Sequence, residues 1–412
     1  MGDIDGETSK HIIICIYKDY RMNEKKTSRN SNIELLRIIA MILIVISHYS
    51  VFSQANIDGM SLGFNKFLLD STNYGLVGVA LFEIITGYYL IELDFKTERV
   101  VNIISKTLFY TVGFFVLFCI IDRSNFSIMQ MINNMFPIIR RRYWYISAYV
   151  ILLFIFPFIN KALKSITRKQ FVSLLAVLVF YFSIAASFFN FKSVEFGGRL
   201  GFMIYYYLIG AYLRMYPNNF LSKKQRSAAL SFVSFVLMTA SVAIINLVGT
   251  RLPAFAGKAK KFYSLNSVLV LILTACLVAF FVNLKPKHSS LINRLGGCTL
   301  GVYLIHENPF VRKWLWVDMF NNSAYAESSM LVVHFVISVI IVYSACTVIE
   351  YVRKYLIEKY VFSKALANIN AGVEKIYKKL NICIEKIVVK IDKESRRDLW
   401  VSLKFKNPVV IC

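Results

Sequence analysis

The feature that most restricts the fold is a series of about ten apolar stretches, most of them long enough to cross a bilayer. A helix needs roughly 20 apolar residues to span a hydrocarbon core about 30 Å thick. Of the 412 residues, 57% are hydrophobic and 17% are charged, whereas an average soluble domain carries roughly 25% charge. Soluble, disordered and disulfide-scaffold classes are excluded. We expect an all-α polytopic integral membrane protein with about ten transmembrane helices.

Hydropathy places the ten expected spans within a membrane domain of residues 32–352. They are 33–51, 73–91, 100–121, 143–160, 171–190, 200–216, 228–249, 263–284, 297–311 and 329–352. The ninth span is short, so we expect it to be tilted, broken or re-entrant. Residues 1–31 form a polar, basic N-terminal tail without a folding role. Its apolar run, 12–17, is too short for a signal peptide, and Met22 is an alternative start.

Positive charge favours one orientation in the membrane. The formal net charge is +24, which in a membrane protein is explained by Lys and Arg on the cytoplasmic side, so no nucleic-acid partner is expected. An even number of spans puts both basic tails on one side, and we expect both termini in the cytoplasm of a bacterial inner membrane. The expected outer loops still hold two basic clusters, Arg140–Arg142 and Lys258–Lys261. They form either a surface for an anionic substrate or an ordinary solvated face.

The basic C-terminal tail, residues 353–412, contains an apolar stripe at helical spacing. The stripe consists of Leu366, Ile369, Val373, Ile376, Leu380, Ile384, Ile387 and Ile391. The lysines that lie largely off it are Lys375, Lys378, Lys379, Lys386 and Lys390. This pattern predicts a basic amphipathic helix lying on the anionic inner leaflet. A coiled coil between two copies, and hence a homo-oligomer, is the alternative.

Metal and disulfide chemistry have no support in the cysteine pattern. The seven cysteines include no CxxC pair, and three of them lie in apolar runs. We therefore expect buried free thiols and no metal ion.

The first span carries ionisable residues that are costly inside a membrane and are therefore candidates for function. Arg37 and His48 are 11 residues apart, which corresponds to about 1100°, or three turns plus 20°, so they share one helix face roughly 16 Å apart along the axis. Glu34 lies one turn before Arg37 and is placed to pair with it. Two interpretations stay open. Either the two residues form one functional path, or Arg37 extends to the headgroups and His48 hydrogen-bonds at the opposite interface.

Other ionisable residues interrupt later spans. Glu83 in the second span needs a partner such as Lys106 in the third, or else a cavity lined by protein. His334 in the tenth span is most simply a hydrogen-bonded packing residue. His306, followed by Glu307, ends a short run in the irregular ninth span and is the stronger candidate for function.

Four segments, in order across residues 33–352, resemble the motifs of the membrane acyltransferase-3 family. They are Arg37-x10-His48 preceded by Glu34; Phe82-Glu83-Ile84-Ile85-Thr86-Gly87-Tyr88-Tyr89-Leu90; Tyr143-Trp144-Tyr145-Ile146-Ser147-Ala148-Tyr149 with Phe156-Pro157; and Leu300-Gly301-Val302-Tyr303-Leu304-Ile305-His306. The chain also departs from the family pattern. Thr86 replaces a serine, Glu83 stands at an apolar position, and Lys96-x-x-Arg99 replaces a pair of arginines.

The resemblance implies a membrane-embedded O-acyltransferase, most often an O-acetyltransferase. Such an enzyme moves an acetyl group from cytoplasmic acetyl-CoA to a hydroxyl of a surface or capsular polysaccharide, or of its lipid-linked precursor. Its partners would be acetyl-CoA, the glycan acceptor and the lipid bilayer.

The resemblance also implies roles for individual residues. His48 would act as the general base on the acceptor hydroxyl, with a transient acyl-histidine as the alternative. Arg37, oriented by Glu34, would bind CoA phosphates together with Lys96 and Arg99.

Further residues would line the acceptor path. Thr86, Tyr303 and His306 would do so, or would polarise the thioester carbonyl. Trp144 would stack on a sugar ring or anchor the helix at the membrane interface. No metal is required by this chemistry.

A glycan flippase or a polymerase component without acyl-transfer activity is the rival function. A polymerase is expected to have a large outer loop, whereas the longest here, 123–142, is about 20 residues. A flippase needs charged residues spread through a central cavity, whereas here they concentrate in the first, second and ninth spans.

Overall fold

The computed structural model describes residues 30–189, 193–362, 365–380 and 382–383. In these residues the regular structure is helical and no strand occurs. Eight helices of this part of the chain are long and apolar enough to cross a membrane. The expectation of an all-α polytopic membrane protein is therefore confirmed.

The eight spans coincide with eight of the ten that hydropathy predicts. They are Ser31–Val51 (α2), Phe64–Leu90, Thr97–Ile121 (α5), Trp144–Ser165 (α7), Arg168–Phe188, Lys224–Gly249 (α11), Lys261–Val282 and Leu331–Glu358. Four of these spans contain shorter elements: α3 (Phe64–Ser71), α4 (Gly75–Leu90), α8 (Arg168–Val179), α9 (Ala186–Phe188), α12 (Val268–Val282) and α17 (Leu331–Val352). Smaller helices complete the described chain: α6 (Ile128–Met135), α10 (Ser193–Met215), α13 (Ser290–Gly296), α14 (Thr299–His306), α15 (Pro309–Lys313) and α16 (Asn322–Tyr325).

The expected sixth and ninth spans are not among the eight. The sixth corresponds to α10, which is interrupted at Gly198, where φ is 53° and the backbone is not helical. The ninth is broken, as its short apolar run predicts. Its first part, α14, has only eight residues, and α15 begins at Pro309, which has no amide hydrogen to continue the preceding helix.

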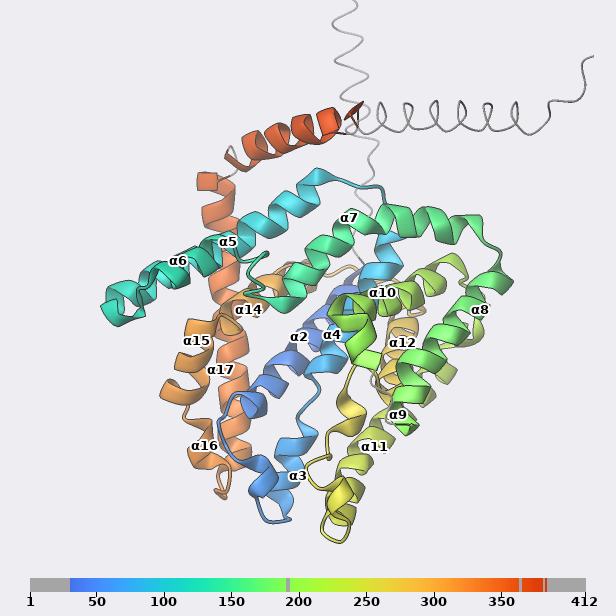
Figure 1. The fold of residues 1–412 in the computed structure, drawn as a ribbon, viewed down its shortest axis with the longest axis vertical. Helices are drawn as coiled ribbons and strands as arrows, with labels where there is room; N and C mark the ends of the chain where they lie inside the picture. The colour runs from blue at the N-terminus through green and yellow to red at the C-terminus, as the bar shows by residue number, and fades with distance from the viewer. Residues whose placement is uncertain (1–29, 190–192, 363–364, 381, 384–412) are drawn as a thin grey trace, which may run out of the picture.

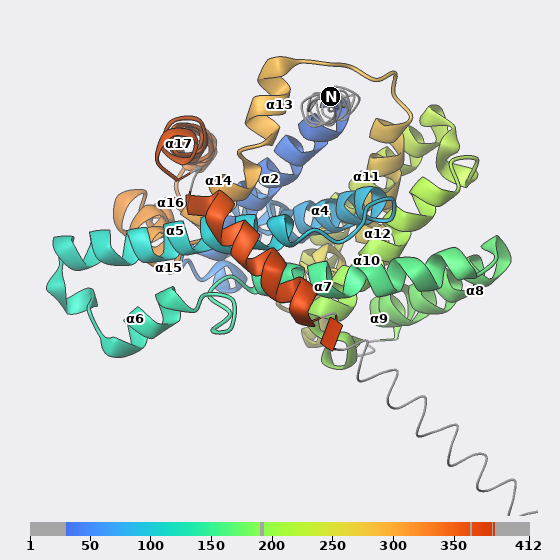
Figure 2. The ribbon, with the colours of Figure 1, turned by 90° about the horizontal axis from the view of Figure 1, so that it is seen from above.

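Helices α2 and α4 lie in the middle of the bundle (Figures 1 and 2), with α14, α15 and α17 on one side and α10, α11 and α12 on the other. Close approach of α4 to α10 depends on two glycines. A Cβ atom at Gly87 would overlap the backbone of Tyr207, and one at Gly210 would overlap the backbone of Ile84. Small residues at such crossings let membrane helices approach closely.

After α17 and a π-helical segment, Arg353–Phe362, the chain turns and forms a helix over 365–380. Figures 1 and 2 show this helix running across the end of the bundle, over α5 and toward α7. The ring of its Tyr377 packs at a tilt against that of Phe95, with ring centroids 4.9 Å apart, while Ile369 and Ile376 of the predicted stripe are exposed. The stripe from Ile384 onward, with Lys386 and Lys390, lies outside the described residues, as do residues 1–29.

Candidate active site

A cavity of about 370 Å³ lies between α2, α4, α5, α7 and α14. Its walls are mostly apolar, as at Met41 and Ile44, and carry five hydroxyl groups on three helices. The hydroxyl residues are Thr86 of α4, Tyr145 and Tyr149 of α7, and Thr299 and Tyr303 of α14. The structure thus brings together Thr86 and Tyr303, two of the residues that the sequence motifs single out.

Three cations line the same cavity: Arg37, Lys106 and Lys354. Arg37 donates to Glu34 across 2.8 Å, and its side chain is 30% exposed. A Cβ atom at Gly296 would lie 2.5 Å from a carboxylate oxygen of Glu34. The predicted Glu34–Arg37 pair is present, and glycine at position 296 makes room for its carboxylate.

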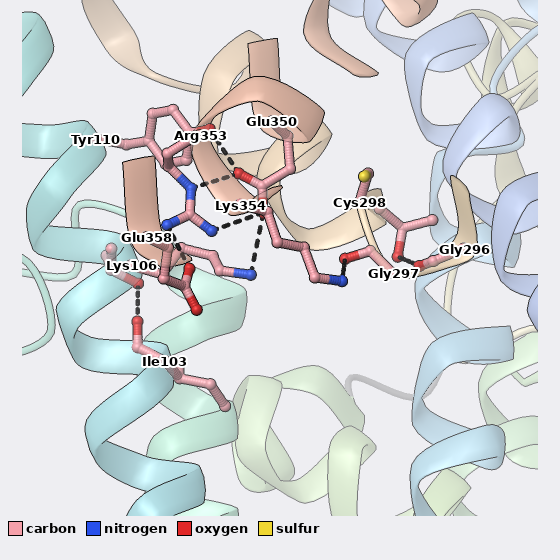
Figure 3. A network of polar contacts seen from close by, with 12 residues as sticks. Ile103, Lys106, Tyr110, Gly296, Gly297, Cys298, Glu350, Arg353, Lys354 and Glu358 are labelled. Carbon is pink, nitrogen blue, oxygen red and sulfur yellow. Dashed lines mark hydrogen bonds and ion pairs between the residues drawn. The ribbon is translucent and has the colours of Figure 1, made fainter. Parts of the chain in front are cut away.

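Lys106 and Lys354 belong to a polar network that joins α5 to the end of α17, shown in Figure 3. Lys106 lies 3.1 Å from a carboxylate oxygen of the buried Glu350, which also accepts hydrogen bonds from Tyr110 at 2.6 Å and from Arg353 at 2.6 Å. Lys354 donates to the carbonyl oxygen of Gly297 at 3.2 Å. Arg353, Glu350 and Tyr110 therefore hold the elements that present the two lysines to the cavity.

The network corrects one expectation. Lys106 pairs with Glu350, 244 positions along the chain, rather than with Glu83. Glu83 is only 1% exposed, and neither of its carboxylate oxygens has a hydrogen-bond partner in the described structure.

Lys96 and Arg99 do not line the cavity. Lys96 is exposed, and Arg99 donates to the carbonyl oxygen of Asp94 in the loop before α5 at 2.5 Å. Lys106 is seven residues beyond Arg99, on the same helix face but about 10 Å deeper along the axis. Lys106 and Lys354 thus line the cavity. Lys96 and Arg99, to which the family resemblance gives a role in binding CoA phosphates, do not line it. Trp144 also does not line it; the guanidinium carbon of Arg199 lies 4.0 Å from its ring centroid.

Two histidines meet near the cavity without lining it. Nδ1 of His48 lies 3.0 Å from Nε2 of His306, although the residues are 258 positions apart. Ile44 and Tyr303, which line the cavity, precede His48 and His306 by about one helical turn each. Arg37 therefore lines the cavity, whereas His48 lies one turn beyond the lining residue Ile44 on the same helix.

Hydrogen bonding defines which nitrogen atoms of this pair carry protons. Nδ1 of His306 lies 2.5 Å from the carbonyl oxygen of Val302, and a carbonyl only accepts, so this nitrogen is protonated. In the neutral ring Nε2 is then an acceptor, and His48 donates to it from Nδ1. Glu307, 3.4 Å from the same nitrogen of His48, favours a proton there as well. Nε2 of His48 is left with a free lone pair.

The other candidate histidine has a structural role, as expected. Nδ1 of His334 is 2.7 Å from the hydroxyl of Tyr49, and its ring stacks on Tyr325 at 3.8 Å between centroids. Within the described residues there is no group of three or more His, Cys, Asp or Glu side chains arranged to hold a metal ion. The described cysteines, Cys119, Cys276, Cys298, Cys346 and Cys383, are free thiols.

Sequence reasoning missed three contributors to this region: Lys354, Glu350 and Arg312. Arg312 lies 3.3 Å from Glu307 and so extends the histidine cluster. Each of these residues sits near a helix end, where charge is common in membrane proteins. What marks them is a contact with a residue distant in the sequence: Glu350 with Lys106, Lys354 with Gly297 and Arg312 with Phe52.

Fold and site together define a polytopic membrane protein with a cavity lined by three cations and a pair of histidines about one helical turn from its lining residues. The family model described as an acyltransferase domain, Acyl_transf_3, matches residues 30–351. The chain belongs to this family and is a membrane acyltransferase. No curated protein and no solved structure matches it.

Proposed function

We propose that the protein is an O-acetyltransferase of a bacterial inner membrane that uses cytoplasmic acetyl-CoA. Its acceptor is a hydroxyl of a surface or capsular polysaccharide, or of the lipid-linked precursor. The observation that supports the proposal is the cavity lined by Arg37, Lys106 and Lys354, with the pair of His48 and His306 about one helical turn beyond its lining residues Ile44 and Tyr303. We place the Arg37 end and both termini on the cytoplasmic side.

The donor fits this path by charge and polarity. Cations form strong charge-assisted hydrogen bonds to phosphate oxygens, so Arg37, Lys106 and Lys354 suit the phosphates of CoA. The apolar walls at Met41 and Ile44 suit its less polar pantetheine arm. The acetyl thioester then lies toward Tyr303.

The acceptor reacts at His48. Its free Nε2 removes the proton of the sugar hydroxyl, and the oxygen attacks the acetyl carbonyl carbon. The C–S bond breaks, and the CoA thiolate leaves and takes up a proton. The hydroxyl of Tyr303 is buried without a hydrogen-bond partner in the described structure and is placed to donate to the developing oxyanion.

The test uses membranes that contain the protein, acetyl-CoA with a labelled acetyl group and a panel of glycan acceptors. His48→Gln removes the base while keeping a polar side chain, and general-base catalysis typically contributes about 10²–10⁴-fold. We expect label transfer to fall by that factor. His334→Gln, a matched control on α17, should retain transfer if its expression equals that of the wild type.

Two outcomes oppose this proposal in different ways. Transfer that persists in His48→Gln contradicts the mechanism but keeps the enzyme. A wild-type protein that neither releases CoA nor transfers label to any acceptor contradicts acetyl transfer and favours a glycan carrier.

A further inference from the structure

Two arginines lie near the junction of α14 and α15, and one of them, Arg312, is close to the histidine pair. Arg312, on α15, donates to Glu307 at 3.3 Å and covers the ring of Phe52 at 4.3 Å. Phe52 in turn packs on His48, with ring centroids 4.7 Å apart. The guanidinium of Arg312 is therefore one ring away from His48, and its side chain remains 34% exposed.

Arg142 approaches the same place from the loop before α7. Its guanidinium lies 5.3 Å from the ring centroid of Phe310, two residues before Arg312. Its Nε atom is buried and has no hydrogen-bond partner among the described residues. Burial first, and then the charge of Arg312, lower the pKa of Arg142, with Tyr143 opposing the effect.

The loop that carries Arg142 is held in place. The hydroxyl of Tyr143 donates to the carbonyl oxygen of Leu304 at 2.8 Å and accepts from Asn308 at 3.0 Å. Ser147 donates to the carbonyl oxygen of Ile138 at 2.8 Å. Arg142 is thus fixed next to the junction of α14 and α15, where the only carboxylate in this group is that of Glu307.

The charges of the group do not balance. The carboxylate of Glu307 lies 3.3 Å from Arg312 and 3.4 Å from Nδ1 of His48. Arg142 pairs with no carboxylate among the described residues, and the charge of Arg312 acts on it. A buried guanidinium nitrogen without a hydrogen-bond partner lowers the stability of the folded protein. A bound ligand that accepts hydrogen bonds removes this cost. Planar guanidinium groups match phosphate and carboxylate oxygens.

From these contacts we propose that Arg142 and Arg312 bind an oxyanion, a phosphate or a carboxylate, of the acceptor glycan. This inference rests on the proposed acetyl transfer and specifies its acceptor as an anionic sugar. The anion fixes the sugar beside Phe52, so that a neighbouring hydroxyl faces Nε2 of His48.

The test measures binding to the purified full-length chain in nanodiscs of zwitterionic lipid. Labelled glucose 1-phosphate and labelled glucuronate separate the phosphate from the carboxylate, and glucose is the neutral probe. We expect at least one anionic sugar to bind about tenfold or more tightly than glucose. Arg142→Gln and Arg312→Gln should each weaken that binding about tenfold or more, as expected when a charged hydrogen bond is lost.

Arg140→Gln is the matched control. It removes the same charge two positions away, from a side chain that is exposed and bonded to Asn133 at 2.8 Å. Binding to this variant should stay within about twofold of wild type. Equal binding of glucose and both anions, or an equal loss in Arg140→Gln, overturns the inference.

CoA release from acetyl-CoA, measured in the same preparations, separates the two proposals. Release without preferential anion binding refutes the anionic acceptor and leaves acetyl transfer standing. Anion binding that depends on Arg142 and Arg312, without CoA release or transfer, keeps the oxyanion site and refutes the transferase reaction.

Discussion

Replacing Glu350 by Gln tests whether the network behind the cavity stabilises the protein. The carboxylate of Glu350 is fully buried and contacts three groups: Tyr110, Lys106 and Arg353. Gln keeps the shape but removes the charge that balances two cations. Removing one partner of a buried ion pair costs about 3–5 kcal/mol, because the other charge stays buried without compensation.

The assay is thermal unfolding followed with a thiol-reactive dye. Cys298 and Cys346 are buried and free, so they react only as the bundle opens. At roughly 2 °C per kcal/mol for a large domain, the midpoint for Glu350→Gln should fall by about 6–10 °C.

Glu358 provides the control, because it pairs with the same guanidinium of Arg353 at 2.6 Å but is 36% exposed. Exposed pairs contribute about 0–1 kcal/mol, so Glu358→Gln should lower the midpoint by no more than about 2 °C. Equal shifts in the two variants, or an unchanged midpoint in Glu350→Gln, would refute the reasoning that burial decides how much an ion pair contributes to stability.

Three further predictions follow from packing and from the site. Gly87→Ala should destabilise the bundle by about 1–3 kcal/mol through overpacking. A Cβ atom at Gly113 has no neighbour within 4 Å, so Gly113→Ala should be neutral or slightly stabilising. Thermal unfolding of the two variants compares their stabilities. Lys106→Gln should raise KM for acetyl-CoA roughly tenfold or more with a smaller change in kcat. The control Lys96→Gln should change neither constant. Steady-state kinetics with varied acetyl-CoA concentration measure both variants. His306→Phe removes the acceptor that orients His48, so kcat should fall at least about tenfold while KM for acetyl-CoA stays within about twofold; an unchanged kcat contradicts the orienting role.

Much of the architecture follows from the sequence because a membrane helix satisfies its backbone hydrogen bonds within its own segment. An apolar stretch of sufficient length therefore indicates a span without knowledge of its neighbours, as the eight coincident spans show. The helical period likewise predicted that Glu34 pairs with Arg37, as the structure shows. It also predicted that Arg37 and His48 share one face of α2. The short apolar run of the ninth span likewise predicted an irregular segment, and the structure breaks it between α14 and Pro309.

The choice of partners between helices depended on tertiary structure. His48 meets His306 across 258 positions, and Lys106 meets Glu350 rather than Glu83. Helical period fixes only the direction of a side chain from its own axis. Which helix lies in that direction, and at what depth, depends on close contacts such as that of Gly301, where a Cβ atom would overlap Glu350. Direction alone therefore does not decide which residues line the cavity. Arg99 lies on the same face of α5 as Lys106 but at another depth, and it does not line the cavity, whereas Lys354 does.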